Sequence, residues 1–182
     1  MLINRLVGAF TFRKSVYAEV EHDPSFTTTA WVLLVVATLL NRLDALFTSS
    51  EWLFAVVVSA ILSILGFAVG VLVVNWIGST LFKANVTFGQ GVRTLGLACV
   101  WRAIGAFGLV LFFSEALSGV LDLLIGLATL VSWLIAAKEA LDLDWVKTVV
   151  TVLLGWLAQF VITTAVSALA LGLLELLFAA LS

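Results

Sequence analysis

Charged residues are scarce in this sequence, and that scarcity excludes the ordinary soluble folds. Only 11% of the 182 residues are Asp, Glu, Lys or Arg, whereas 63% are apolar. Soluble domains contain about 25% charged and about 45–50% apolar residues. A folded domain of about 150 residues still leaves roughly 30% of its chain's surface exposed, so water cannot surround this excess of apolar side chains. The composition predicts an all-α integral membrane protein.

Cysteine, histidine and proline are almost missing as well. The lone cysteine, Cys99, excludes a disulfide framework and a cysteine-ligated metal cluster. The lone histidine, His22, excludes sites that need several imidazoles, such as a His-pair haem. The sequence also has no phosphate-binding glycine loop and no nucleophile motif. With a net charge of −2 there is no basic surface for nucleic acid. We therefore expect no enzymatic activity, no cofactor and no metal.

Long uncharged runs predict five membrane-spanning helices. One crossing of a bilayer needs about 20 residues, and successive runs of this length are separated by short polar patches. After residue 76 the second run should become an interfacial segment, followed by a loop over residues 83–90. The transmembrane domain then covers residues 25–182, with spans at approximately 25–43, 52–76, 94–114, 117–137 and 148–174.

The first 24 residues have a mixed composition. Their apolar residues recur at intervals of three and four, which favours one face of a helix. We expect a short amphipathic helix that lies on the membrane surface and ends before Pro24. The alternative is a polar tail that packs against nothing. The recurring residues are Leu2, Leu6, Phe10, Phe12, Val16 and Val20.

The distribution of cations predicts the orientation. With five spans, seven Lys and Arg residues fall on the side of the N-terminus and only Arg42 on the other. Because cytoplasmic loops accumulate Lys and Arg, the N-terminus should be cytoplasmic and the C-terminus outside a plasma (inner) membrane. The seven are Arg5, Arg13, Lys14, Lys83, Arg93, Lys138 and Lys147.

Small residues recur at four-residue intervals in two of the predicted spans. Gly66 and Gly70 form such a pair in the second span, and Thr164, Ala168 and Gly172 repeat the spacing in the fifth. Small side chains let helix backbones approach closely within a membrane. This spacing favours close packing within one bundle, and the alternative is a contact between two copies.

Three ionisable residues, Arg102, Glu115 and Asp122, lie within or beside the spans, where a charge costs about 3 kcal/mol on insertion scales. Arg102 should face the bundle interior, with Glu139 as a plausible partner. Asp122 lies at a different depth along its span, so a direct bridge to Arg102 is not expected. A structural role is the favoured interpretation, and a polar transport path is the alternative.

Three stretches of the chain resemble the YIP family of Ypt/Rab-interacting membrane proteins. Phe10–Leu34 carries Asp23-Pro24-Ser25, Gly78–Ala98 carries Thr87-Phe88 and Arg93, and Leu134–Leu154 carries Lys138-Glu139 and Trp145. The resemblance implies five spans, a cytoplasmic N-terminus and no enzymatic activity. Eukaryotic relatives act in vesicle trafficking between endoplasmic reticulum and Golgi, but this chain is similar to the short prokaryotic members.

One departure from the family pattern concerns the third span. Relatives often have a tyrosine and a proline early in this span, whereas the corresponding stretch here is residues 97–101, Leu-Ala-Cys-Val-Trp. A straighter third helix is therefore expected.

The leading functional hypothesis is a non-enzymatic membrane scaffold or accessory subunit. It would present helix-packing surfaces and a small cytoplasmic surface, made of the N-terminal helix, Lys83–Arg93 and Lys138–Lys147, to another membrane protein or to a second copy. One alternative is a small oligomeric transporter or channel that uses Arg102 and Asp122. A second alternative is a membrane-shaping or trafficking-type protein.

Overall fold

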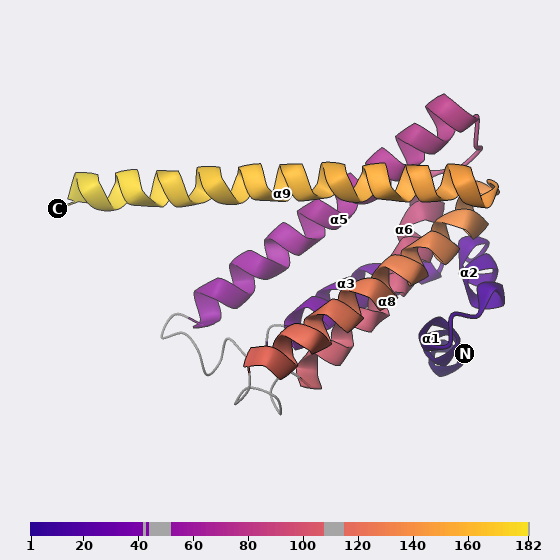
Figure 1. Cartoon of the computed structure of the whole chain (residues 1–182), viewed down its shortest axis with the longest axis horizontal. Coiled ribbons are helices and arrows are strands. Elements are labelled where there is room, and N and C mark those ends of the chain that lie inside the picture. Colours follow the sequence, from indigo (N-terminus) through magenta and orange to yellow (C-terminus); the bar gives the residue numbers. More distant parts are fainter. Residues whose placement is uncertain (42, 44–51, 108–114, 182) are drawn as a thin grey trace.

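A computed structural model gives the fold of the chain and describes residues 1–41, 43, 52–107 and 115–181. All regular elements in these ranges are helices (Figure 1), which confirms the all-α prediction. They are α1 (Leu2–Phe10), α2 (Lys14–Glu21), α3 (Phe26–Asn41), α5 (Trp52–Phe82), α6 (Phe88–Ala98), the 3₁₀ helix η1 (Cys99–Phe107), α8 (Glu115–Leu141) and α9 (Trp145–Leu181).

Three helical segments are long and apolar enough to cross a membrane. They are Trp52–Phe82, Leu117–Leu141 and Trp145–Val166. Helix α3 is apolar but has only 16 residues. The described structure thus supports three of the predicted five crossings by length and composition alone.

The second predicted span is longer than expected, because α5 continues without a break from Trp52 to Phe82. The residues after 76, which were expected to form an interfacial segment, continue this helix. The last turns of α5 pack closely on α8, since a Cβ added to Gly78 would lie 2.7 Å from Leu141 Cδ2. The helix ends where Lys83 adopts a left-handed backbone with φ 58° and Ala84 N donates to Gly78 O at 2.9 Å.

The third predicted span is not one straight helix. Helix α6 ends at Ala98 and the chain continues in the tighter 3₁₀ winding of η1. A 3₁₀ run of this length is uncommon, and tertiary contacts account for it: Trp101 stacks on Phe12 at 5.0 Å, and a Cβ on Gly105 would lie 2.9 Å from Asn41 Cα. The predicted span is therefore divided between an α-helix and a 3₁₀ helix. Residues 108–114 lie outside the described residues.

The N-terminal segment is a helical hairpin, whereas a single surface helix was expected. Phe12 takes a left-handed φ of 54°, and Arg13 N donates to Gly8 O at 2.8 Å, so α1 ends and the chain reverses. Helix α2 then packs on α1, where Gly8 leaves no room for a Cβ: the added atom would lie 2.3 Å from Val16 Cγ1. Val16, Tyr17 and other residues of α2 are buried against the bundle.

The hairpin and the turns before α6 and α9 lie at one end of the molecule, and the C-terminus lies at the far end of α9 (Figure 1). Helix α9 crosses α5 at close range. A Cβ on Gly155 would lie 2.5 Å from Val74 Cγ2, and one on Gly70 would lie 2.9 Å from Gln159 Oε1. Glycine is needed at this crossing because both backbones approach it.

Candidate functional site

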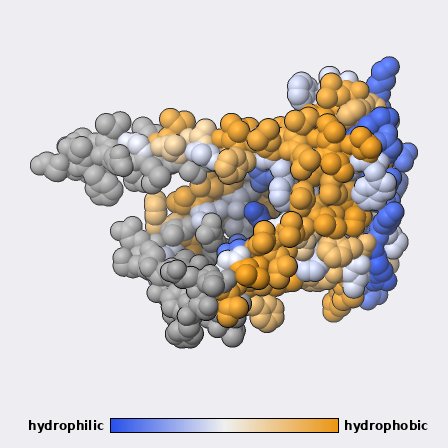
Figure 2. All heavy atoms as spheres, in the orientation of Figure 1, coloured by the Kyte–Doolittle hydropathy of each residue, from blue (hydrophilic) through white to orange (hydrophobic). Residues whose placement is uncertain are grey.

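Hydrophilic side chains gather at one end of the bundle, while its flanks are hydrophobic (Figure 2). We call this end the polar end and define it as residues 2–21, which contain α1 and α2, residues 83–93 and residues 138–147. These segments are far apart in the sequence. Their contacts show how the fold brings them together.

Arg5 joins α1 to α2 and to the start of α3. Its Nε donates to Glu19 Oε1 at 2.9 Å, and its Nη1 donates to Asp23 Oδ2 at 2.8 Å. The guanidinium also lies 5.2 Å from the centre of the Phe26 ring. Asp23 in turn accepts a hydrogen bond from Ser25 N at 3.1 Å. The Ser25 hydrogen bond and Arg5 together lower the pKa of Asp23.

Arg93 of α6 caps the C-terminus of α2. Its side chain is buried, and its Nε donates to the carbonyl oxygens of Val20 at 3.0 Å and Glu21 at 3.1 Å. Its Nη1 donates to Thr27 Oγ1 at 3.3 Å. The last carbonyls of a helix have no partner within the helix and carry a partial negative charge. The Arg93 guanidinium therefore provides both hydrogen-bond donors and a positive charge at the C-terminus of α2.

The start of α6 is fixed by a capping box. Thr87 Oγ1 accepts from Gln90 N at 3.3 Å, and Gln90 Oε1 accepts from Thr87 N at 2.8 Å. Gln90 Nε2 also donates to Glu21 Oε1 at 3.1 Å, which ties α6 to α2. Burial raises the pKa of Glu21, and the nearby charge of Glu139 raises it further.

Glu139 therefore lies at the polar end beside Glu21. Among the described residues no ion pair joins Glu139 to Arg102, which instead lines a cavity together with Asp122. Helix α2 packs beside α8. The charged neighbour of Glu139 is therefore Glu21, which belongs to the N-terminal hairpin.

Trp145 joins the hairpin to the turn between α8 and α9. Lys14 Nζ and Lys138 Nζ lie 5.5 Å and 5.4 Å from the centre of its ring. Lys138 Nζ also donates to Leu143 O at 3.1 Å. Cation–π contacts of this kind contribute about 0.5–1 kcal/mol at exposed sites. They hold residues 138–147 close to the start of α2.

Tyr17 connects the hairpin to the middle of α8. Its side chain is fully buried, and its hydroxyl lies 3.3 Å from Ser132 Oγ. Burial raises the pKa of Tyr17 to about 12. Because desolvation disfavours the phenolate, the folded state holds the proton more tightly than the unfolded chain does.

The single tyrosine makes this shift measurable. We expect the ultraviolet absorbance of phenolate to rise near pH 12 in the folded protein, compared with about 10 for a free tyrosine. The stability that Tyr17 contributes is complete below pH of about 10 and is lost as the pH rises through its folded pKa. Ser132→Ala should move the titration further up, since the hydrogen bond to Ser132 lowers this pKa. A titration at the free value would show that the hairpin is not docked.

A cavity of about 330 Å³ lies deeper in the bundle, between η1, α8 and α9. Arg102 and Asp122 both line it, although the sequence placed them at different depths. Within the described structure no ion pair joins these two side chains. Hydrophilic atoms are visible in the hollow between the two hydrophobic flanks (Figure 2). The other polar residues that line the cavity are Asn41, Cys99, Thr129 and Gln159.

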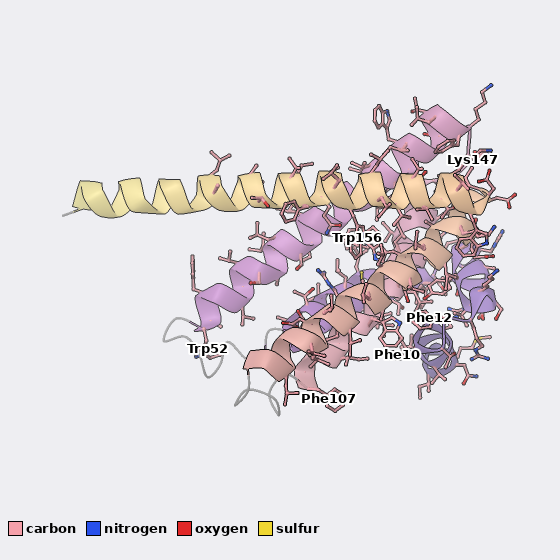
Figure 3. All side chains as sticks on the ribbon, in the orientation of Figure 1. Phe10, Phe12, Trp52, Phe107, Lys147 and Trp156 are labelled. Atoms are coloured by element: carbon pink, nitrogen blue, oxygen red, sulfur yellow. The ribbon has the colours of Figure 1, made fainter. Side chains whose placement is uncertain are left out.

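Aromatic rings close the inner side of this cavity. The Trp133 ring packs edge-on against Phe67 at 6.0 Å and against Trp156 at 6.1 Å, and all three residues line the cavity. Trp156 lies on the side of α9 that faces the bundle (Figure 3). Edge-to-face ring pairs are favourable. These three rings therefore form a rigid inner wall of the cavity.

The predicted packing residues fall into two groups. Gly66 and Gly70 of α5 are buried, and Gly70 lies at the crossing with α9. Thr164 and Ala168 of α9 are exposed, and a Cβ on Gly172 would meet nothing within 4 Å. Gly155, which supplies the α9 side of the crossing, was not among the predicted packing residues. Its only signal was a glycine in an otherwise large-residue stretch of α9.

The chain matches a known protein family. A family model described as the Yip1 domain matches residues 7–179. The chain belongs to the Yip1 domain family. It is thus a membrane protein with apolar helices, and the match includes both the polar end and the cavity of this Yip1 domain. No curated protein and no solved structure matches the chain.

The stretches that resemble the family meet at the polar end of the Yip1 domain. Phe10–Leu34 supplies α2 and the Asp23 turn, Gly78–Ala98 supplies the Thr87 cap and Arg93, and Leu134–Leu154 supplies Lys138 and Trp145. The hydrogen bonds and ring contacts described above join all three stretches. The family pattern therefore coincides with the residues that assemble this end.

Proposed function

We propose that this protein is a non-enzymatic scaffold or accessory subunit that binds a partner through its polar end. The observation that carries the proposal is the convergence of three distant stretches on that end, each held by specific polar contacts. Among the described residues, no group of His, Cys, Asp and Glu could hold a metal ion. The specific polar contacts described above therefore build a surface at the polar end.

The polar end is preorganised for binding. Its buried anchors, Arg5, Tyr17 and Arg93, fix α1 and α2 against the bundle. A surface that is already ordered loses little conformational entropy when a partner binds. The side chains it leaves exposed carry both signs of charge: Arg13, Glu19, Lys83, Asp142 and Lys147.

We also propose the membrane arrangement. Helices α5, α8 and α9 cross the bilayer, and α3 and the α6–η1 segment provide two more crossings. All seven cations assigned to the cytoplasmic side are in segments of the polar end, so the N-terminus is cytoplasmic. The C-terminus, at the far end of α9, is then outside a plasma (inner) membrane. The N- and C-termini lie at opposite ends of the molecule (Figure 1), which supports placing them on opposite sides of the membrane.

Exposed small residues on α9 offer a second contact within the membrane. Thr164 and Ala168 lie on its surface, and Gly172 has open space around it. Without a hydrophobic driving force in lipid, such residues favour close helix contact. A second copy or another membrane protein would pack there.

Charge reversal at the polar end tests the proposal. Arg13→Glu and Lys83→Glu change exposed side chains, so folding should be unaffected. We expect chemical cross-linking in native membranes to capture the same partner with the wild-type protein in repeated experiments. The two variants should lose at least about 90% of this product, because a reversed charge repels a complementary surface.

A matched control replaces a lipid-facing residue. Leu157→Ile alters an exposed apolar side chain of α9 and should leave cross-linking unchanged. A protein that extracts as a lone monomer without a reproducible partner would contradict the scaffold. Equal capture by wild type and both charge variants would move the contact away from the polar end.

The structure bears differently on the two alternatives. The transport hypothesis is supported by the cavity that Arg102 and Asp122 both line. The rings of Phe67, Trp133 and Trp156 close the inner side of this cavity, which favours a binding site over a continuous transport path. For membrane shaping, the buried side of α1 includes Arg5 and Ala9, while Leu2, Ile3 and Val7 remain exposed and could enter the headgroup layer.

A further inference from the structure

We propose that the cavity between η1, α8 and α9 binds a phospholipid whose headgroup carries a phosphate and a primary ammonium group. Arg102 would hold the phosphate and Asp122 the ammonium group. The polar end does not take part, so this site is separate from the proposed scaffold surface.

Two separated charges of opposite sign define the chemistry of the cavity. Arg102 from η1 is partly buried and Asp122 from α8 is exposed; both line the cavity, and they do not pair with each other in the described structure. A guanidinium is well suited to bind phosphate through two parallel hydrogen bonds. A carboxylate accepts hydrogen bonds from an ammonium group. A zwitterion can satisfy both residues at the same time.

The membrane makes such satisfaction important. A charged side chain at bilayer depth is unfavourable, and such residues are normally paired or line a cavity. Direct pairing would have satisfied both Arg102 and Asp122, yet the fold places them on the same cavity without joining them. A ligand with two charges provides each residue with a partner.

The walls of the cavity identify the ligand as a lipid. Phe160 lines the cavity and is 68% exposed, so the cavity opens to the outside of the bundle. The helices that form the cavity also expose apolar side chains, Leu124 and Leu127 on α8 and Leu157 and Val161 on α9. Acyl chains could lie along these side chains, which face hydrocarbon in a membrane. A soluble zwitterion would gain nothing from that surface.

Native mass spectrometry of the full-length protein in detergent provides the test. Phosphatidylethanolamine, phosphatidylcholine and phosphatidylglycerol would be added in separate titrations. We expect the ethanolamine lipid to remain bound at about tenfold lower concentration than the other two, since a hydrogen bond to a charged group contributes about 1.5–3 kcal/mol. The choline headgroup has no N–H donor, and the glycerol headgroup has no cation.

Variants locate the site. Arg102→Gln and Asp122→Asn should each remove most of this preference, whereas Asp144→Asn, which changes an exposed carboxylate at the polar end, should leave it intact. A second readout does not depend on variants. Cys99 is the only cysteine and lines the cavity, so bound phosphatidylethanolamine should slow its reaction with a small thiol reagent at least about tenfold.

Three results would overturn the proposal. The first is equal retention of all three lipids by the wild-type protein. The second is an unchanged preference in well-folded Arg102→Gln and Asp122→Asn proteins. The third is equal protection of Cys99 by free phosphoethanolamine, which would assign the cavity to a soluble zwitterion. None of these results would affect partner binding at the polar end, so the two proposals can fail separately.

Discussion

Replacement of Arg93 by methionine is expected to release the N-terminal hairpin from the bundle. The guanidinium donates to the carbonyls of Val20 and Glu21 and to Thr27, and it is buried. Methionine fills a similar volume but leaves these acceptors without a donor. Hydrogen bonds from a charged group contribute about 1.5–3 kcal/mol each. Docking of the hairpin should therefore weaken by about 3 kcal/mol or more.

Trypsin cleavage after Arg13 and Lys14 in detergent measures this release, because both residues lie at the start of α2. Cleavage should be more than about 100-fold faster for Arg93→Met, in proportion to the population of open hairpin. Lys147→Met is the matched control, since Lys147 forms only a surface pair with Asp144. Equal cleavage rates for wild type and Arg93→Met would show that the cap does not hold α2 in place.

The same residue illustrates which part of the fold could be predicted from the sequence. Hydropathy and the turn-forming residues around Thr87 placed Arg93 just before a span that begins at residue 94, whereas α6 begins at Phe88 and includes Arg93. Its carbonyl acceptors lie on α2, more than 70 positions earlier in the chain. No local pattern encodes such a contact, so the role of Arg93 as a cap for a different helix could not be predicted.

The two backbone corrections have a similar origin. The repeat of apolar residues over positions 2–20 suggested one helix, because periodicity alone does not register a break. The break at Phe12 depends on the close approach of Gly8 and Val16 and on the stacking of Phe12 against Trp101. In the third predicted span, the contacts of Trp101 and Gly105 similarly favour the tighter 3₁₀ winding. Tertiary packing decides both cases.

Depth along a helix was also a limited guide. Arg102 and Asp122 were placed at different depths by counting residues from the ends of straight spans. Arg102 lies in the 3₁₀ helix η1 and Asp122 in α8, and α9 diverges from α8 toward its C-terminus (Figure 1). The cavity that contains both residues arises from this divergence and from the 3₁₀ segment. Residue counting could identify the two charges, but it could not bring them to one site.

Replacement of Gly155 by leucine is expected to separate α9 from α5. Even a single Cβ at this position would lie 2.5 Å from Val74 Cγ2, which is far inside van der Waals contact. Overpacking of a well-packed core costs about 1–3 kcal/mol, and here the whole isobutyl group must enter. We expect the thermal unfolding midpoint in detergent to fall by at least about 5 °C.

Gly172→Leu and Gly119→Leu provide matched controls. Each introduces the same side chain into a long helix, but an added Cβ at either position meets nothing within 4 Å. Neither variant should lower the unfolding midpoint of the monomer by more than about 1 °C. Because the clash at Gly155 is with a specific methyl group, Val74→Ala should restore part of the lost stability to Gly155→Leu. If the three leucine variants unfold at the same temperature, the close crossing of α5 and α9 is wrong. If Gly172→Leu instead changes only the oligomeric state, the exposed small residues of α9 form a contact between copies, and the crossing at Gly155 stands.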